Sequence, residues 1–181
     1  MVVSFGSNDG TTDSPTLKQH NFIENIVSEV DSDIKDAALN FFKKLFLEVL
    51  QKGHGTLAGV ISHKTKKLPS ILSDGIPLQN RISIPNIIRE LKEKNDLQAN
   101  AKLSAQFSLI SGMMQSDGIT IFTDNGEVAS YNVFIKHPDK KSKESTHGGA
   151  RSRTFISLSK LVGSKLKSAY IQSQDGKIEF N

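Results

Sequence analysis

The stretch that decides the fold is ITIFTDNGEVASYNVFI, residues 119–135. Apolar residues dominate its two ends, 119–122 and 128–135, and Asp124-Asn125-Gly126 separates them. An Asn-Gly pair between two such runs is the strongest short signal for a β-hairpin, because both residues tolerate the positive φ of a tight turn. The sequence therefore predicts two antiparallel strands here.

Strand and helix patterns continue on both sides of this hairpin. Further strands are predicted over residues 57–61, over 71–78 with an interruption at Asp74-Gly75, and over a second hairpin, 169–172 and 177–180, around Asp175-Gly176. Apolar residues at helical spacing predict helices over 22–30, 34–49, 83–91, 97–114 and 151–166. This mixture indicates an α/β protein, a mixed β-sheet flanked by helices with a helical extension at its N-terminus.

The composition suits one folded domain. The chain has 181 residues, 36% of them hydrophobic, and a formal net charge of +4, which permits a substantial core and a phosphate-rich ligand. Residues 1–19 are rich in Gly, Ser, Thr, Asn and Asp and predict a flexible leader. Residues 20–53 are predicted to form the N-terminal helices and residues 54–181 the main domain.

Several classes of protein are disfavoured by the same composition. The chain has no cysteine, which excludes disulfides, thiolate zinc sites and a cysteine nucleophile. No apolar run approaches the ~20 residues of a membrane span, and residues 1–13 lack the pattern of a secretory signal. Aromatic residues are not interleaved with basic ones, as a nucleic-acid stacking surface requires. We therefore expect a cytoplasmic protein with neither a membrane nor a nucleic acid as partner.

One candidate site residue lies where a predicted helix ends and a strand begins, in Ser116-Asp117-Gly118-Ile119. A carboxylate beside a glycine at such a junction can reach a metal ion or a ribose, since glycine lets a ligand approach the backbone. The alternative is an ordinary Asp-Gly turn without a ligand.

A second candidate site is THGGARSRT, residues 146–154, directly before a predicted helix. Glycines ahead of a helix N-terminus expose backbone N–H groups, the helix dipole favours an anion there, and Arg151 and Arg153 add charged donors. This arrangement could hold a triphosphate, although it is not a P-loop, because no Gly-x-x-x-x-Gly-Lys-Ser/Thr run exists. The alternative is a solvated basic loop before an ordinary helix.

Taken together, these motifs resemble the diadenylate cyclase (DAC) domain family. Asp117-Gly118-Ile119 is similar to the family's Asp-Gly-Ala motif, and residues 149–153 are similar to its Gly-Thr-Arg-His-Arg motif. Residues 173–176 stand where the family has an acidic turn, and residues 54–61 are similar to its first core strand. The resemblance covers roughly residues 36–181.

The resemblance implies a nucleotide site. In that family two domains face each other, each holding one ATP with a divalent metal, and the two ATP molecules are joined into cyclic di-AMP. It implies that Asp117 binds Mg²⁺ or Mn²⁺ and activates the attacking hydroxyl, with Asp175 as a second metal ligand. The implied nucleotide-binding residues are Gly118, Gly149, Ala150, Arg151, Ser152 and Arg153. A homo-oligomer with facing sites is the implied assembly.

The chain also departs from the family pattern. Ala150 replaces the family threonine, Ser152 replaces the histidine between the arginines, and Gln174 stands where a carboxylate is expected. Catalytic positions have changed while the glycines and arginines remain. This combination predicts a sensor of ATP or a cyclic dinucleotide, which would need no metal. The alternatives are an active diadenylate cyclase and an interaction module without a ligand.

Overall fold

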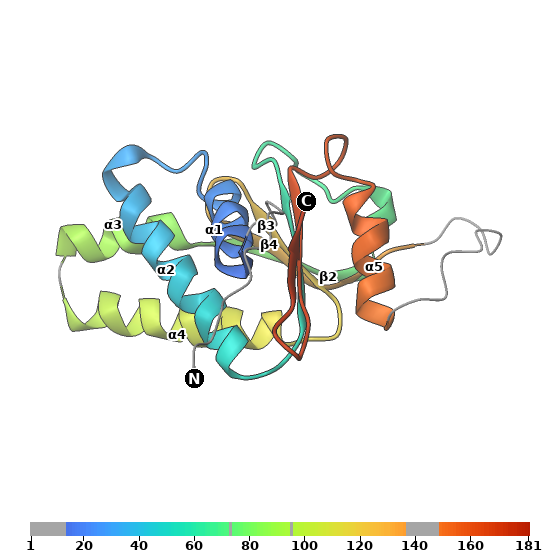
Figure 1. Ribbon diagram of the computed structural model, residues 1–181. Helices are drawn as coiled ribbons and strands as arrows, with labels where there is room; N and C mark the ends of the chain where they lie inside the picture. Colours follow the sequence, from blue (N-terminus) through green and yellow to red (C-terminus); the bar gives the residue numbers. More distant parts are fainter. Residues whose placement is uncertain (1–13, 73, 95, 137–148) are drawn as a thin grey trace, which may run out of the picture.

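The computed structural model describes residues 14–72, 74–94, 96–136 and 149–181. Its elements, in chain order, are α1 (Pro15–Ile26), α2 (Ser32–Gln51), β1 (Thr56–Ile61), a short 3-10 helix (Ser70–Leu72), β2 (Asp74–Ser83), α3 (Ile84–Lys94), α4 (Leu97–Met114), β3 (Ile119–Thr123), β4 (Glu127–Phe134), α5 (Ala150–Ser159), β5 (Ser168–Gln172) and β6 (Ile178–Phe180). The predicted α/β class, with a mixed sheet flanked by helices, is confirmed (Figure 1).

The six strands form one sheet in the order β2-β4-β3-β1-β5-β6. The two central strands, β1 and β3, run parallel, and every other neighbouring pair is antiparallel. Both predicted hairpins are confirmed, with β3 paired to β4 and β5 paired to β6. Because β1 and β3 point the same way, residues just before both strands meet at one end of the sheet.

Helices cover the two faces of the sheet unequally. Figure 1 shows α1 to α4 on one side of the strands and α5 on the other. Alternate residues of β1 serve the two sides, with Ala58 and Val60 in the core under α1 to α4, and Leu57 and Ile61 in the core under α5. This alternation is the period-two pattern of a strand buried on both faces.

The larger core is rich in aromatic residues that join the N-terminal helices to the sheet. The rings of Phe22 on α1 and Tyr170 on β5 stack with centroids 4.9 Å apart, and Phe46 on α2 meets Tyr170 edge to face at 5.3 Å. Burial raises the pKa of the Tyr170 hydroxyl, which donates a hydrogen bond to Gln172 Oε1 at 3.1 Å. The residues predicted as an N-terminal extension thus share one core with the sheet.

Three boundaries differ from the sequence-based expectations. Helix α1 begins at Pro15, inside the predicted leader of residues 1–19, because the Ser14 side chain accepts a hydrogen bond from the Leu17 N–H and proline suits the first helical position. The remainder of that leader, residues 1–13, lies outside the described residues.

The predicted helix over 151–166 is too long, since α5 ends at Ser159. The chain then turns through Gly163, whose φ of +81° suits glycine and not a helix interior. The strand predicted over 71–78 is also shifted, because residues 70–72 form the 3-10 helix and β2 runs from Asp74 to Ser83. Strand β2 accommodates Pro77 because it lies at the edge of the sheet.

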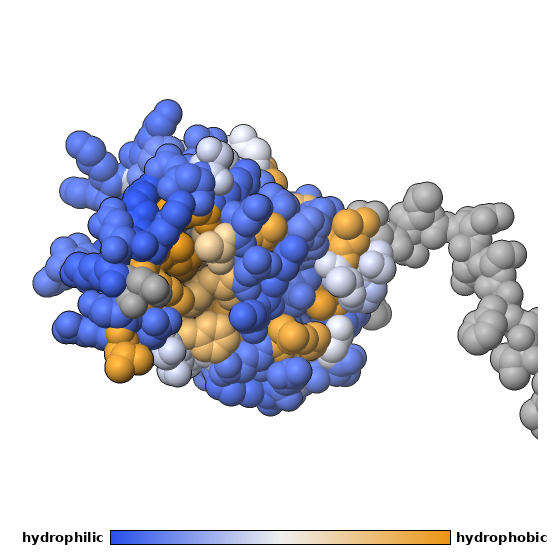
Figure 2. Space-filling view, turned by 90° about the vertical axis from the view of Figure 1, so that its left-hand side faces the viewer, coloured by the Kyte–Doolittle hydropathy of each residue, from blue (hydrophilic) through white to orange (hydrophobic). Residues whose placement is uncertain are grey.

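An apolar groove of about 390 Å³ lies on the face formed by α2, α3 and α4. Figure 2 shows this side of the molecule, with hydrophobic residues at the bottom of the hollow and hydrophilic residues around it. Phe41, Leu103 and Phe107 are among its lining residues. None of the helices in the described ranges is both long enough and apolar enough to cross a lipid bilayer.

Candidate functional site

A pocket of about 640 Å³ opens at the end of the sheet where β1 and β3 begin. Three segments far apart in the sequence meet there, namely residues 117–119, the start of α5 and the turn after β5. The lining residues are Leu57, Asp117, Gly118, Ile119, Val133, Phe134, Gly149, Ala150, Arg151, Ser152, Thr154, Ile171, Ser173, Gln174 and Asp175. Of the predicted nucleotide- and metal-binding residues, all of which the structure describes, each except Arg153 lines this pocket.

The two motifs touch each other inside this pocket. The Arg151 guanidinium donates from Nη2 to Asp117 Oδ1 across 3.3 Å. The Asp117 side chain is 89% exposed and that of Arg151 is 28% exposed. The carboxylate is thus open to solvent and to a ligand, whereas the guanidinium is held partly inside the protein.

Asp117 is positioned by the close approach of its neighbour Gly118 to β4. The Gly118 N–H donates to Asn132 Oδ1 at 3.2 Å. A Cβ at Gly118 would lie 2.4 Å from the Asn132 carbonyl carbon, so only glycine fits without a shift of the backbone. Asn132 itself has φ +52°, and it is the only non-glycine residue in the described ranges with a positive φ. Asparagine tolerates that conformation better than most residues.

Arg151 is supported from behind by Gly55, just before β1. A Cβ at Gly55 would lie 3.2 Å from Arg151 Nη1 and 3.1 Å from the Gln172 carbonyl oxygen. A side chain at position 55 would therefore press on the guanidinium. Neither Gly55 nor Asn132 was predicted as a site residue. The signals in the sequence were a glycine just before one predicted strand and an asparagine inside another.

The start of α5 presents backbone N–H groups to the pocket. Gly149 is the N-cap residue and no side-chain cap bonds to this helix end within the described part of the chain. The first backbone bond of the helix joins the Arg153 N–H to the Gly149 carbonyl, so the N–H groups ahead of Arg153 precede the helical ladder. Such an end binds anions well, because the N–H groups and the helix dipole act together.

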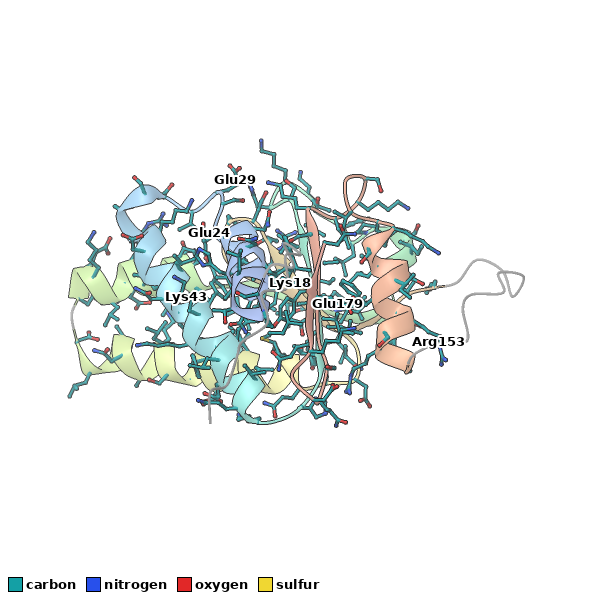
Figure 3. The ribbon with its side chains drawn as sticks, viewed as in Figure 1. Lys18, Glu24, Glu29, Lys43, Arg153 and Glu179 are labelled. Carbon is teal, nitrogen blue, oxygen red and sulfur yellow. The ribbon has the colours of Figure 1, made fainter. Side chains whose placement is uncertain are left out.

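Arg153 lies elsewhere. Figure 3 shows it on α5 with its side chain directed away from the sheet, and it does not line the pocket. The predicted pair of arginines is therefore divided between the pocket side and the outer side of one helix. His147, which belongs to the same predicted motif of residues 146–154, lies outside the described residues.

A second carboxylate, Asp175, lines the same pocket from the turn between β5 and β6. Hydrogen bonding to Ser173 keeps the pKa of Asp175 below its ordinary value of 3.8, so this side chain is charged at neutral pH. No group of three or more His, Cys, Asp or Glu residues arranged to hold a metal ion occurs in the ranges that the structure describes. Asp117 and Asp175 could contribute to holding a cation, but the described residues do not form a complete metal site.

The opposite end of the sheet carries a different polar cluster, which the sequence did not reveal. Asp124 is 1% exposed and accepts hydrogen bonds at Oδ1 from the His63 backbone N–H and from His63 Nδ1, each at 2.7 Å. Lys167 Nζ lies 2.5 Å from Asp124 Oδ2. Burial raises the pKa of Asp124, but the bonds from Lys167 and His63 outweigh it and hold the pKa below 3.8.

The fold of the whole chain was compared with known proteins. The sequence matches no protein-family model and no curated protein. Its structure is similar to a crystal structure of a double mutant of DacA from Staphylococcus aureus, with 15% sequence identity, a TM-score of 0.53, and coverage of 83% of this chain and 84% of that one. It is also similar to a hypothetical membrane spanning protein from Bacillus cereus, with 18% identity, a TM-score of 0.54, and coverage of 92% of this chain and 67% of that one. The chain therefore has a DAC-like fold, as the motifs in its sequence predicted.

Proposed function

We propose that this chain binds an adenine nucleotide in the pocket between Asp117 and the start of α5, and that it serves as a sensor of ATP or a cyclic dinucleotide. The observation that carries the proposal is the convergence of Arg151, the N-terminus of α5 and Gly118 on one pocket of about 640 Å³. A pocket of this size is typical of sites for small molecules and cofactors. Charged donors and free helix N–H groups are the groups that recognise phosphate.

The apolar part of the same pocket suits the remainder of a nucleotide. Leu57, Ile119, Val133, Phe134 and Ile171 line it beside the polar groups. Phe134 is 46% exposed, so part of this aromatic side chain is available for contact with a flat base. An adenosine moiety could thus lie on this surface while its phosphates reach Arg151.

Sensing is favoured over catalysis by what the pocket lacks among the described residues. A diadenylate cyclase needs metal to neutralise charge during phosphoryl transfer, and Asp117 and Asp175 do not form a complete metal site. Ala150 also removes a hydroxyl from the start of α5, where the related family has threonine. The pocket thus keeps groups that bind a phosphate and has fewer groups that would catalyse phosphoryl transfer.

Calorimetric titration of the protein with ATP and with cyclic di-AMP tests the proposal, and α5 supplies a matched pair of variants. We expect saturable binding that Arg151→Ala weakens about 10- to 100-fold, the usual loss for a charged hydrogen bond. Arg153→Ala changes the same net charge two residues away, outside the pocket lining, and should weaken binding less than about 3-fold.

Flat titrations of the parent protein with both nucleotides would reject the proposal. The remaining hypothesis would then be that the chain is an interaction module without a ligand. Equal losses in the two arginine variants would show that general positive charge, and not the pocket, attracts the nucleotide.

Active cyclisation is the second candidate function, and one observation favours it. Asp117 lies in the pocket together with Asp175, and a metal ion held by a nucleotide's phosphates could complete its coordination with such carboxylates. Incubation with ATP and Mn²⁺ or Mg²⁺, followed by mass spectrometry, decides between the two. Cyclic di-AMP formed by the parent protein and not by Asp117→Asn would establish a cyclase. In that case two copies must face each other, and the mass of the complex in solution should double when ATP is added.

A further inference from the structure

The charges around the pocket are unfavourable for a polyanion. Among the described residues that line it, Arg151 is the only cation, and Asp117 and Asp175 are both acidic. The described side chains that line the pocket we propose for a nucleotide are thus more often negative than positive. Its one guanidinium, moreover, already bonds to Asp117 across 3.3 Å.

Both members of this pair are held in place by the backbone. Gly55 lies behind Arg151, where an added Cβ would come within 3.2 Å of Nη1, and the contact of Gly118 with Asn132 fixes the chain beside Asp117. The Asp117 carboxylate therefore approaches Arg151 from the pocket side. An oxygen of a phosphate group that enters the pocket would approach the guanidinium from that same side.

From this geometry we infer that Asp117 is an internal competitor of the ligand and that it sets the affinity and specificity of the site. The inference rests on the proposed function. In the free protein the carboxylate occupies the position on Arg151 that a phosphate takes in the complex. A nucleotide binds only when its phosphate replaces the carboxylate, and a nucleoside without phosphate gains nothing from the exchange.

Two physical effects determine the size of the competition. An exposed ion pair contributes little, since solvent screens it and the side chains lose freedom in forming it. The charge of Asp117 also repels an incoming phosphate at short range. Together they predict that Asp117→Asn tightens the binding of ATP about 3- to 10-fold. This direction is opposite to that expected for a carboxylate that binds the nucleotide itself or its metal.

A double-mutant cycle measures the effect directly. The dissociation constant of ATP is determined for the parent protein, Asp117→Asn, Arg151→Ala and the double variant, in buffer with a chelator and without divalent metal. Adenosine is titrated alongside as the ligand without phosphate. Asp175→Asn is the matched control, because it removes an equal charge from the same pocket at a side chain whose hydrogen-bond partner is Ser173.

We expect tighter ATP binding for Asp117→Asn, a gain below about 2-fold for the same change in the Arg151→Ala background, and unchanged adenosine binding. The inference is overturned if Asp117→Asn weakens ATP binding, or if its gain is equal with and without Arg151. It is also overturned if Asp175→Asn gives the same gain, since general repulsion then explains the result. Binding of ATP by the parent protein in any of these cases leaves the proposed function standing. Absence of binding by the parent and by Asp117→Asn rejects both proposals.

Discussion

Strand β3 has an aspartate beyond each of its two ends, and the two side chains have opposite surroundings. Asp117, before the strand, is 89% exposed and is paired with Arg151. Asp124, after the strand, is 1% exposed and is bonded by both His63 and Lys167. A buried carboxylate must have its partners in the folded state, whereas an exposed one can exchange its partner for a ligand. One end of the sheet therefore holds its carboxylate among fixed partners, and the other leaves its carboxylate open to solvent.

The largest effect on stability is expected from Asp124→Ala. Removing this carboxylate leaves the His63 backbone N–H without its partner. The partly exposed Lys167 ammonium loses its nearer partner and keeps Glu29, whose Oε1 lies 3.9 Å away. We expect a loss of about 3 kcal/mol in the free energy of unfolding, a value at the lower end for a broken buried ion pair because Lys167 is partly exposed. Urea denaturation followed by circular dichroism measures it. A loss below about 1 kcal/mol would contradict the structural role assigned to this end.

The next effect is expected from Gly118→Ala, at the binding end. The added methyl would lie 2.4 Å from the Asn132 backbone, so β4 must shift. A steric conflict of this kind costs about 2 kcal/mol. Gly149→Ala is the matched control in the same pocket, because its methyl would meet nothing within 4 Å, and it should change the unfolding free energy by less than about 1 kcal/mol, the usual cost of alanine at an N-cap. Similar values for the two variants would contradict the close approach of Gly118 to β4.

Acid should weaken the contribution of Asp124 to stability. Because the pKa of Asp124 lies below its ordinary value of 3.8 in the folded protein, its ionised form stabilises the fold above that pH. This contribution is lost as the pH falls below 3.8 through the folded pKa. The difference in unfolding free energy between the parent and Asp124→Asn should therefore shrink between pH 5 and pH 2, as measured by urea titrations at several pH values. A constant difference would show that the charge of Asp124 is not responsible.

The smallest effect on stability is expected from Asp117→Ala. Its ion pair with Arg151 is exposed, so the unfolding free energy should change by less than about 0.5 kcal/mol. The same substitution should alter the affinity for ATP. An Asp117→Ala variant that folds normally but binds ATP with a different affinity would sharpen the contrast with Asp124. A clear loss of stability in this variant would contradict that contrast.

Much of the fold was predictable because its signals are local. The Asn-Gly turn between β3 and β4 and the Asp-Gly turn between β5 and β6 depend on residues next to each other in the chain. The pocket was predictable in part, since Asp117 and residues 149–152 belong to short motifs whose order resembled a family. The start of α1 could also have been found, as Ser14 followed by Pro15 is a recognised helix beginning.

Other features depend on contacts that no local pattern records. His63 and Lys167 are far from Asp124 in the sequence, and only the parallel pairing of β1 with β3 brings the first of them to it. The different orientations of Arg151 and Arg153 depend on where α5 lies against the sheet, which helical spacing alone does not determine. The end of α5 was missed because Leu161 and Val162 continue its apolar pattern, although the chain turns through Gly163.

The short length of helix α5 limits its stability. It has ten residues, and it is the only α-helix on its side of the sheet among the described residues. A helix of this length is barely stable in water by itself, so it depends on the burial of Phe155 and Leu158 against the strands. Its amide protons should consequently exchange with deuterated solvent sooner than those of α2, and a molecule seated at its first turn should slow that exchange.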